Sequence, residues 1–161
     1  MVELKFFEPK DLSELDYELD EIQSQFSALP KQALERIESR NQNEDFFAYP
    51  VTIFYDEKIA GFCVLDFGDD KFEMTDNPDS VLLRALSVNP EFQGKGIGQS
   101  MMAILDDFVK EHHKDCNEIV LSVNEMNNLA IQIYLKTGYL FHGKRINGRS
   151  GPQLVMSKVL D

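Results

Sequence analysis

The stretch Leu82-Leu83-Arg84-Ala85-Leu86-Ser87-Val88-Asn89-Pro90-Glu91-Phe92-Gln93-Gly94-Lys95-Gly96-Ile97-Gly98 decides how the rest of the chain is arranged. It begins as an apolar run typical of a buried strand, which Asn89-Pro90 closes. A glycine-rich turn follows, and the chain then takes on helical spacing. A strand, a tight turn and a helix N-terminus direct several backbone N–H groups at one point, which favours a bound phosphate or pyrophosphate. The residues alone therefore predict an anionic cofactor at this turn.

Length and composition predict a single domain over residues 1–161 of an intracellular, cytoplasmic protein. The chain has 161 residues, of which 43% are hydrophobic and 27% charged, as in ordinary globular domains. Cys63 and Cys116 have neither CxxC nor Cys/His ligand spacing, so we interpret them as reduced thiols and expect no metal. The sequence has no signal-peptide pattern and no apolar run of membrane-spanning length, so we expect neither secretion nor a membrane partner.

The negative charge of the chain lies entirely before the glycine-rich turn. The net charge is −12; residues 1–90 hold 8 Lys and Arg against 20 Asp and Glu, whereas residues 91–161 hold 8 of each. This balance argues against nucleic-acid binding, which needs a basic face. Two interpretations stay open: a solvated acidic surface that aids solubility, or an acidic field that attracts a cationic acceptor.

Hydrophobic periodicity predicts a mixed α/β sheet with helices on both faces. The expected helices are about 10–27, Pro30 through Ile37, Ile97 to about Phe108, and Asn127 or Asn128 to the stop at Gly138. The expected strands are 2–7, 46–55, 59–67, 81–88, 119–123, 139–144 and 152–159. We expect His112, His113 and Lys114 to form a solvated cationic cap at the end of their helix, and 147–151 to be a flexible turn.

The glycine spacing excludes two common phosphate-binding motifs. No Lys-Ser/Thr pair follows the turn, as a P-loop requires, and no acidic residue ends the next strand, as a dinucleotide site requires. The spacing that does match is Gln/Arg-x-x-Gly-x-Gly/Ala, with Gln93, Gly96 and Gly98 in place.

A second signature lies about thirty residues further on, with Asn127, Ala130 and Tyr134 followed by Lys136-Thr137-Gly138-Tyr139. Together the two signatures resemble the GNAT superfamily of acetyl-CoA-dependent N-acyltransferases, over roughly residues 82–141. The resemblance implies an α/β (α+β) fold. Its sheet would be mixed, mostly antiparallel and of about seven strands, with four helices and a splay between the fourth and fifth strands.

The resemblance also implies where acetyl-CoA binds. The pantetheine arm would pair with the backbone near Leu86, Ser87 and Val88, and a bulge near Asn89-Pro90 would open the gap for it. The pyrophosphate would take N–H groups from the turn, and Lys95 and Lys136 would reach the 3′-phosphate. The implied cofactor residues are Leu86, Ser87, Val88, Gln93, Gly94, Lys95, Gly96, Ile97, Gly98, Gln99, Asn127, Ala130, Tyr134 and Lys136.

The same resemblance gives Tyr134 the role of the general acid that protonates the leaving thiolate, because a phenol can donate as charge develops on sulfur. The alternative is a buried aromatic residue whose hydroxyl is satisfied by backbone. Asn127 either contacts pantetheine or serves as a plain helix cap. A backbone N–H near Val88 would polarise the thioester carbonyl.

The general base is open, because the strand 81–88 contains Arg84 and no acid. The candidate bases are Glu125, Glu73, Asp79 and a water chain; Glu125 is the residue we assign. Arg84 needs a partner, such as Glu73 or an acid of the first two helices, and serves either as a structural ion pair or as a substrate contact.

The acceptor side is less defined. Phe46, Phe47 and Tyr49 line either the acceptor side or the core. Arg145 and Arg149 lie in a C-terminal hairpin that, as the resemblance implies, borders the acceptor pocket or a dimer interface.

The expected function is transfer of an acetyl group from acetyl-CoA to a primary amine, by direct attack in a ternary complex. The acceptor would be a small molecule, possibly cationic such as a polyamine or aminoglycoside, or a peptide or lysine amine. The resemblance also implies that the chain can form a homodimer. The alternatives are a non-catalytic CoA-binding module of the same fold, and a nucleotide-dependent enzyme that uses the same turn.

Overall fold

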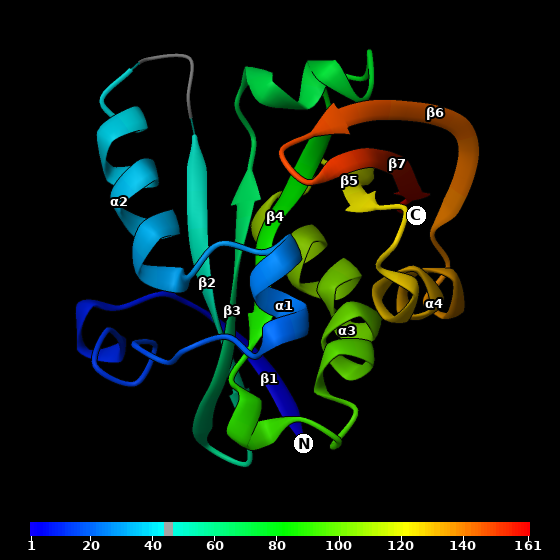
Figure 1. Cartoon of the computed structure of the whole chain (residues 1–161). Helices are drawn as coiled ribbons and strands as arrows, with labels where there is room; N and C mark the ends of the chain where they lie inside the picture. Colours follow the sequence, from blue (N-terminus) through cyan, green and yellow to red (C-terminus); the bar gives the residue numbers. More distant parts are fainter. Residues whose placement is uncertain (44–46) are drawn as a thin grey trace.

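A computed structural model describes residues 1–43 and 47–161 of the chain. Its centre is a seven-stranded sheet with the strand order β1-β2-β3-β4-β5-β7-β6 (Figure 1). The strands are β1 (Val2–Phe6), β2 (Ala48–Tyr55), β3 (Lys58–Asp66), β4 (Ser80–Val88), β5 (Glu118–Asn124), β6 (Leu140–Gly148) and β7 (Gly151–Val159). The helices are α1 (Glu21–Phe26), α2 (Pro30–Arg40), α3 (Ile97–His112) and α4 (Asn128–Lys136). The predicted fold class is confirmed.

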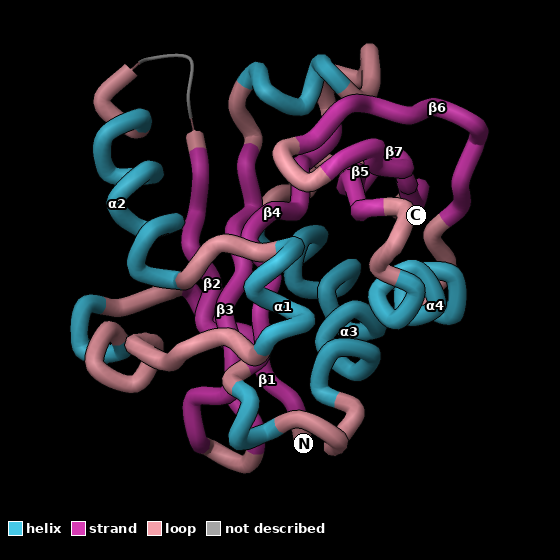
Figure 2. The backbone as a smooth tube through the Cα atoms, in the orientation of Figure 1, coloured by secondary structure: helices cyan, strands magenta, loops and turns pink. Residues whose placement is uncertain are grey.

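The two faces of the sheet pack against different helices, as alternation along β3 shows. Phe62 and Val64 pack with Ala33 and Ile37 of α2 in one apolar cluster. Cys63 and Leu65, which alternate with these residues along the strand, pack in the other cluster, which contains the buried residues of α3. Successive side chains of a strand point to opposite faces, so β3 joins the two cores. Figure 2 shows the helices on either side of the strands.

The sheet splays where β4 meets β5. All other neighbouring strands are antiparallel, but β4 and β5 are parallel and pair only from Ser80↔Glu118 to Leu82↔Val120. Beyond Leu82 the two strands separate, which opens a gap between their C-terminal halves. The predicted splay between the fourth and fifth strands is therefore confirmed.

The bulge that accompanies the gap lies at Ala85, so the prediction of a bulge near Asn89-Pro90 is wrong. Arg84 pairs with Val64, whereas Ser87 pairs with Phe62, so β4 has one more residue than β3 between these pairs. Ala85 absorbs the extra residue with a φ of 53°. This left-handed conformation costs a non-glycine residue about 1 kcal/mol. Asn89 still donates to the carbonyl of Ala60, at 2.8 Å, so regular pairing resumes after the bulge.

The helix predicted at about 10–27 is wrong over most of its length. A short 3-10 turn covers Pro9–Asp11, an irregular segment follows, and only α1 is helical. Long-range bonds hold the irregular part: the buried carboxylate of Asp11 accepts from Thr52 Oγ1 at 3.0 Å, and Tyr17 Oη bonds Ser87 Oγ at 2.7 Å. Asp20 then caps α1 by accepting from the N–H of Gln23 at 2.7 Å. Tertiary contacts have overridden helical spacing.

Two smaller predictions need revision. The turn predicted at 147–151 is tighter, because β6 and β7 pair as far as Gly148↔Gly151 and leave two residues between them. His113 is half-buried, with its ring 4.1 Å from that of Phe67, so the predicted solvated cap is wrong there. Phe46, predicted to begin a strand, lies outside the described residues. Within the described residues, no helix is long and apolar enough to cross a membrane.

Candidate active site

The glycine-rich turn presents unused backbone donors. Gly94 and Gly96 have φ values of 81° and 72°, which favour glycine, and no atom lies within 4 Å of where a Cβ would stand. Gly96 is the N-cap of α3. The six N–H groups from Gly94 to Gln99 donate to no group of the described chain, whereas that of Gln93 donates to the carbonyl of Pro90 at 3.2 Å. Free donors at a helix N-terminus suit a phosphate.

The rest of the turn has structural contacts. Ile97 is buried in the core that contains α3, and the Cβ position of Gly98 lies 3.5 Å from Ile133 Cδ1. The ammonium of Lys95 lies 5.9 Å from the centre of the Tyr55 ring. Lys136 is exposed at the C-terminal end of α4.

Helix α4 positions Tyr134 beside the gap. Asn127 Oδ1 caps the helix by accepting from the N–H of Ala130 at 3.3 Å. Two turns later Tyr134 is buried, and it lines the cavity described below. Its hydroxyl makes no hydrogen bond within the described chain, so the backbone does not satisfy it. Burial raises the pKa of Tyr134 to about 12, which keeps the phenol protonated at neutral pH.

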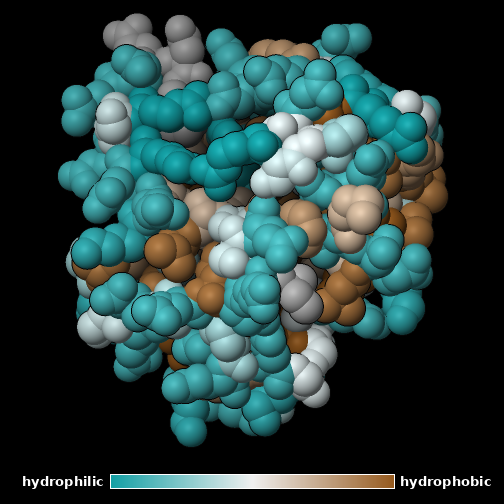
Figure 3. Space-filling model, in the orientation of Figure 1, coloured by the Kyte–Doolittle hydropathy of each residue, from teal (hydrophilic) through white to brown (hydrophobic). Residues whose placement is uncertain are grey.

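A cavity of about 520 Å³ lies in the gap between β4 and β5. Its walls are Leu82 to Leu86 of β4, Leu121 to Asn124 of β5, and Tyr134. Residues of α1, α2 and the β6–β7 turn surround its mouth. Figure 3 shows hydrophilic residues gathered over the region between α2 and the β6–β7 hairpin. A site of this size accommodates a small ligand with a few polar contacts.

Helix α1 lies across the gap and occupies the backbone of β4. Gln23 donates from Nε2 to the carbonyl of Val88 at 2.8 Å and accepts from the N–H of Val88 at 3.1 Å. Ser27 Oγ donates to the carbonyl of Leu86 at 3.1 Å. On the other side of the gap, Ser150 Oγ donates to the carbonyl of Gln25 at 3.0 Å. The backbone predicted to pair with pantetheine is thus engaged by α1 in this structure.

Arg84 has two acidic partners, neither of which was predicted. Its Nη1 lies 2.9 Å from Asp66 Oδ2 and 2.7 Å from Asp70 Oδ2. Arg40 of α2 shares Asp70, at 2.6 Å. The guanidinium of Arg40, followed by that of Arg84, holds the pKa of Asp70 below its usual range. Glu73 and the acids of the first two helices are not partners of Arg84.

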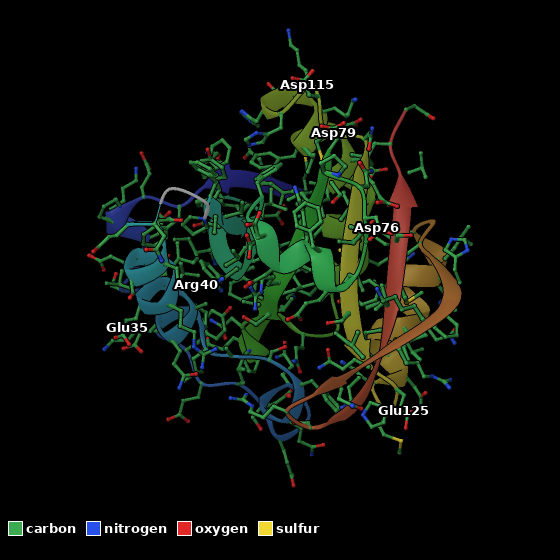
Figure 4. The ribbon with its side chains drawn as sticks, turned by 90° about the horizontal axis from the view of Figure 1, so that it is seen from above. Glu35, Arg40, Asp76, Asp79, Asp115 and Glu125 are labelled. Carbon is green, nitrogen blue, oxygen red and sulfur yellow. The ribbon has the colours of Figure 1, made fainter. Side chains whose placement is uncertain are left out.

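The predicted carboxylate bases lie outside the cavity. Glu125, Glu73 and Asp79 are exposed, and none of them lines its wall. Asp79 and Glu125 lie at opposite ends of the molecule in Figure 4. Among the described residues, Asp66 is the one acid of the cavity wall, and its other oxygen accepts from the N–H of Gly68 at 2.8 Å.

Comparison with known proteins identifies the family. The model of the acetyltransferase (GNAT) family matches residues 11–139. The chain belongs to this family. It is an acetyl-CoA-dependent N-acetyltransferase by class, and the predicted resemblance is confirmed.

Two relatives come from Bacillus subtilis. This acetyltransferase is 33% identical to the uncharacterized N-acetyltransferase YbbJ over 99% of the chain and 98% of that protein. It is 32% identical to a spermine/spermidine N(1)-acetyltransferase over 59% of the chain and 61% of that protein.

Solved structures share the fold at low sequence identity. AAC(6′)-Ib in complex with paromomycin and acetyl-CoA has a TM-score of 0.77 and 18% identity, covering 98% of this chain and 93% of that one. Spermidine N-acetyltransferase from Vibrio cholerae in complex with CoA and spermine has a TM-score of 0.68 and 18% identity, covering 98% and 95%. At this identity the likeness establishes the fold of this acetyltransferase.

Sequence reasoning missed several residues of the cavity. Ser27 lies inside the wrongly extended first helix, and Arg36 and Arg40 of α2 received no role from the sequence. Gln23, which bonds the backbone of Val88, lies inside the same wrongly extended helix. One signal was available for Asp66, since it follows the apolar run from Ile59 to Leu65 directly. An acid at the end of a buried strand needs a cationic partner.

Proposed function

We propose that this acetyltransferase transfers the acetyl group of acetyl-CoA to a primary amine by direct attack in a ternary complex. The observation that carries the proposal is the unbonded hydroxyl of Tyr134 in the wall of the cavity between β4 and β5. The Tyr134 ring is buried, but its hydroxyl is not among the fully buried polar atoms without a partner, so it is open to the cavity and a ligand there can reach it.

The turn fits the pyrophosphate of CoA. The N–H groups of Gly94 to Gln99 are free, and the open space beside Gly94 and Gly96 lets a phosphate approach the backbone. Backbone groups of Leu86 and Val88 would hold the pantetheine arm once Gln23 and Ser27 release them. Acetyl-CoA supplies an activated thioester carbonyl, and the chain supplies position and proton transfer.

The chemistry balances with one acid and a route to solvent. The neutral amine nitrogen forms a bond to the acetyl carbon, the carbon–sulfur bond breaks, and Tyr134 protonates the departing sulfur. The nitrogen then loses one proton to give the amide, and the phenolate of Tyr134 regains one, both by way of water in the open mouth. The N–H of Val88 donates to the carbonyl oxygen as negative charge develops there. The ammonium form of the amine must first lose a proton. Because the cavity wall lacks Glu125, Glu73 and Asp79, we assign that proton to water in the open mouth.

Thiol release from acetyl-CoA with a panel of amines tests this function. Tyr134→Phe is expected to lower kcat at least about tenfold, which corresponds to about 1.4 kcal/mol. Tyr139→Phe is the matched control, since Tyr139 is also buried with an unbonded hydroxyl but lies outside the cavity wall. Equal losses in both variants would remove Tyr134 from the mechanism.

Two outcomes would favour the other function classes. Binding of CoA by calorimetry without turnover of any amine would indicate a non-catalytic CoA module. Competition between CoA and ATP or NAD would indicate a nucleotide-dependent enzyme. Spermine belongs in the panel because one relative is named for it.

A further inference from the structure

The cavity of this acidic protein is lined by cations. Arg36 and Arg40 of α2, Arg84 of β4 and Arg149 of the β6–β7 turn line it, against Asp66 as the one acid of the described wall. The chain as a whole has a net charge of −12. The charge of the cavity wall is therefore opposite in sign to that of the protein.

Two of these arginines, Arg36 and Arg149, form no ion pair within the described chain. The other two, Arg84 and Arg40, lie in a cluster with Asp66 and Asp70, where two guanidinium groups face two carboxylates. Arg36 and Arg149 are both exposed at the mouth, so they stay hydrated until a ligand arrives.

The two unpaired arginines come from opposite sides of the mouth. Arg36 belongs to the helix that packs on β2, β3 and β4, whereas Arg149 belongs to the turn that Ser150 ties to α1. Figure 4 shows Arg40 nearer the sheet than Glu35, whose side chain lies at the outer edge of α2. A ligand that enters the cavity thus passes between guanidinium groups, which pair with carboxylate or phosphate in a bidentate way.

We infer that the acceptor amine carries an anionic group, a carboxylate or a phosphate, which Arg36 and Arg149 bind at the mouth of the cavity. This inference rests on the proposed function and names its substrate class. A polycation would meet the guanidinium groups of Arg36 and Arg149, because Asp66 and Asp70 neutralise Arg84 and Arg40, and the like charges would repel it. The acidic surface of the first half of the chain therefore lies apart from the acceptor site, as a solvated surface.

Matched acceptors test the charge directly. The first set is an ω-amino acid, its primary amide, and the diamine of the same chain length; the second is phosphoethanolamine against ethanolamine. Thiol release from acetyl-CoA gives kcat/KM for each acceptor. We expect the kcat/KM of the ω-amino acid to exceed those of its amide and its diamine, or that of phosphoethanolamine to exceed that of ethanolamine, by about tenfold or more.

Variants assign the preference to the two arginines. Arg36→Gln and Arg149→Gln are each expected to raise KM for the anionic acceptor several-fold and to leave kcat/KM for the neutral amide unchanged. Arg145→Gln is the control, because Arg145 is an exposed arginine of the same hairpin outside the cavity wall. It should alter neither value.

The outcomes separate this inference from the proposed function. If the diamine or the neutral amines are the better acceptors, the inference is wrong and the acetyltransferase proposal stands. If Arg36→Gln and Arg149→Gln change KM for acetyl-CoA instead, the arginines bind the phosphates of CoA, and the inference is again wrong.

Calorimetry gives a readout that does not depend on turnover. With the protein saturated by CoA, the ω-amino acid or phosphoethanolamine should bind and the diamine should not. Absence of turnover together with this binding pattern would contradict the proposed function alone. Absence of binding by both anionic acceptors would overturn the inference.

Discussion

Asp66 depends on Arg84 at the level of single residues. The Asp66 side chain is 0% exposed, and Arg84, at 42% exposure, is its ion-pair partner at 2.9 Å. A buried carboxylate without such a partner is costly, whereas the intact pair need not add net stability. Removing one partner of the pair should therefore destabilise the fold, whereas removing both should cost much less.

Arg84→Ala is expected to lower the free energy of unfolding by about 3 kcal/mol, at the lower end for a broken buried pair because the guanidinium is partly exposed. Urea denaturation measures this. Arg36→Ala, which breaks no ion pair, should change the free energy of unfolding by less than about 0.5 kcal/mol. Adding Asp66→Asn to Arg84→Ala should restore most of the loss, and a loss that persists would contradict the explanation.

The pH profile of the enzyme should reflect the raised pKa of Tyr134. Burial raises that pKa to about 12, so the acid keeps its proton throughout the range in which the enzyme is stable. We expect kcat not to fall between about pH 8 and about pH 10, where an unperturbed phenol begins to ionise. A falling limb in that range, absent from the residual activity of Tyr134→Phe, would contradict this assignment.

At the scale of elements, α1 competes with the substrate for one strand edge. Gln23 satisfies both backbone groups of Val88, and Ser27 satisfies the carbonyl of Leu86. These are the groups proposed for pantetheine, so binding of CoA must displace the two side chains. The free energy needed to break these hydrogen bonds therefore weakens the binding of CoA.

Gln23→Ala is expected to tighten CoA binding about threefold to tenfold, because a typical neutral hydrogen bond contributes about 0.5–1.5 kcal/mol. Calorimetry with CoA measures the change. Ser24→Ala is the control on the same helix, since the Ser24 hydroxyl donates to the nearby carbonyl of Glu21. Weaker binding in Gln23→Ala would mean that Gln23 contacts CoA rather than competing with it.

The sequence predicted those elements whose ends are set locally. Helix α4 is an example, because Asn127 caps it and Gly138, with a φ of 100°, follows its end. The segment 10–27 was mispredicted because Asp11 and Tyr17 are held by residues 41 and 70 positions away.

The candidate site likewise has a part that the sequence predicts locally and a part that depends on tertiary contacts. The glycine-rich turn is a local motif and was found, whereas the partners of Arg84 depend on how strands pair. Asp66 and Asp70 precede it by 18 and 14 residues, and no spacing rule identifies such contacts.

At the scale of the whole molecule, the aromatic cluster at the end of α3 links acidity to stability. The ring of His113 lies 4.1 Å from that of Phe67 and 5.2 Å from that of Tyr49, and its Nε2 is buried without a hydrogen bond in the described chain. Burial, with a smaller contribution from His112, lowers the pKa of His113. The fold therefore favours the neutral imidazole.

His113 should make the protein less stable in acid. Below the unfolded pKa of 6.5 the unfolded chain takes up the proton before the folded chain does, so stability falls as the pH drops through this value. When the pH is lowered from about 7.5 to about 5.5, we expect the Tm of His113→Phe to decrease less than the Tm of the wild type. His142→Phe, on exposed β6, is the control and should behave as the wild type does.

The bulge at Ala85 sets the phase of β4. Before it, Val81 and Leu83 pack into the core that contains α3; after it, Leu86 and Val88 do so, and the alternation has moved from odd to even positions. One extra residue thus changes which positions of β4 face the core. Before the bulge, Arg84 points toward the acids of the cavity; after it, the backbone of Val88 faces the gap. Deleting Ala85 would give β4 a single alternation, and the side chains of Leu86 and Val88 would then face the opposite side of the sheet.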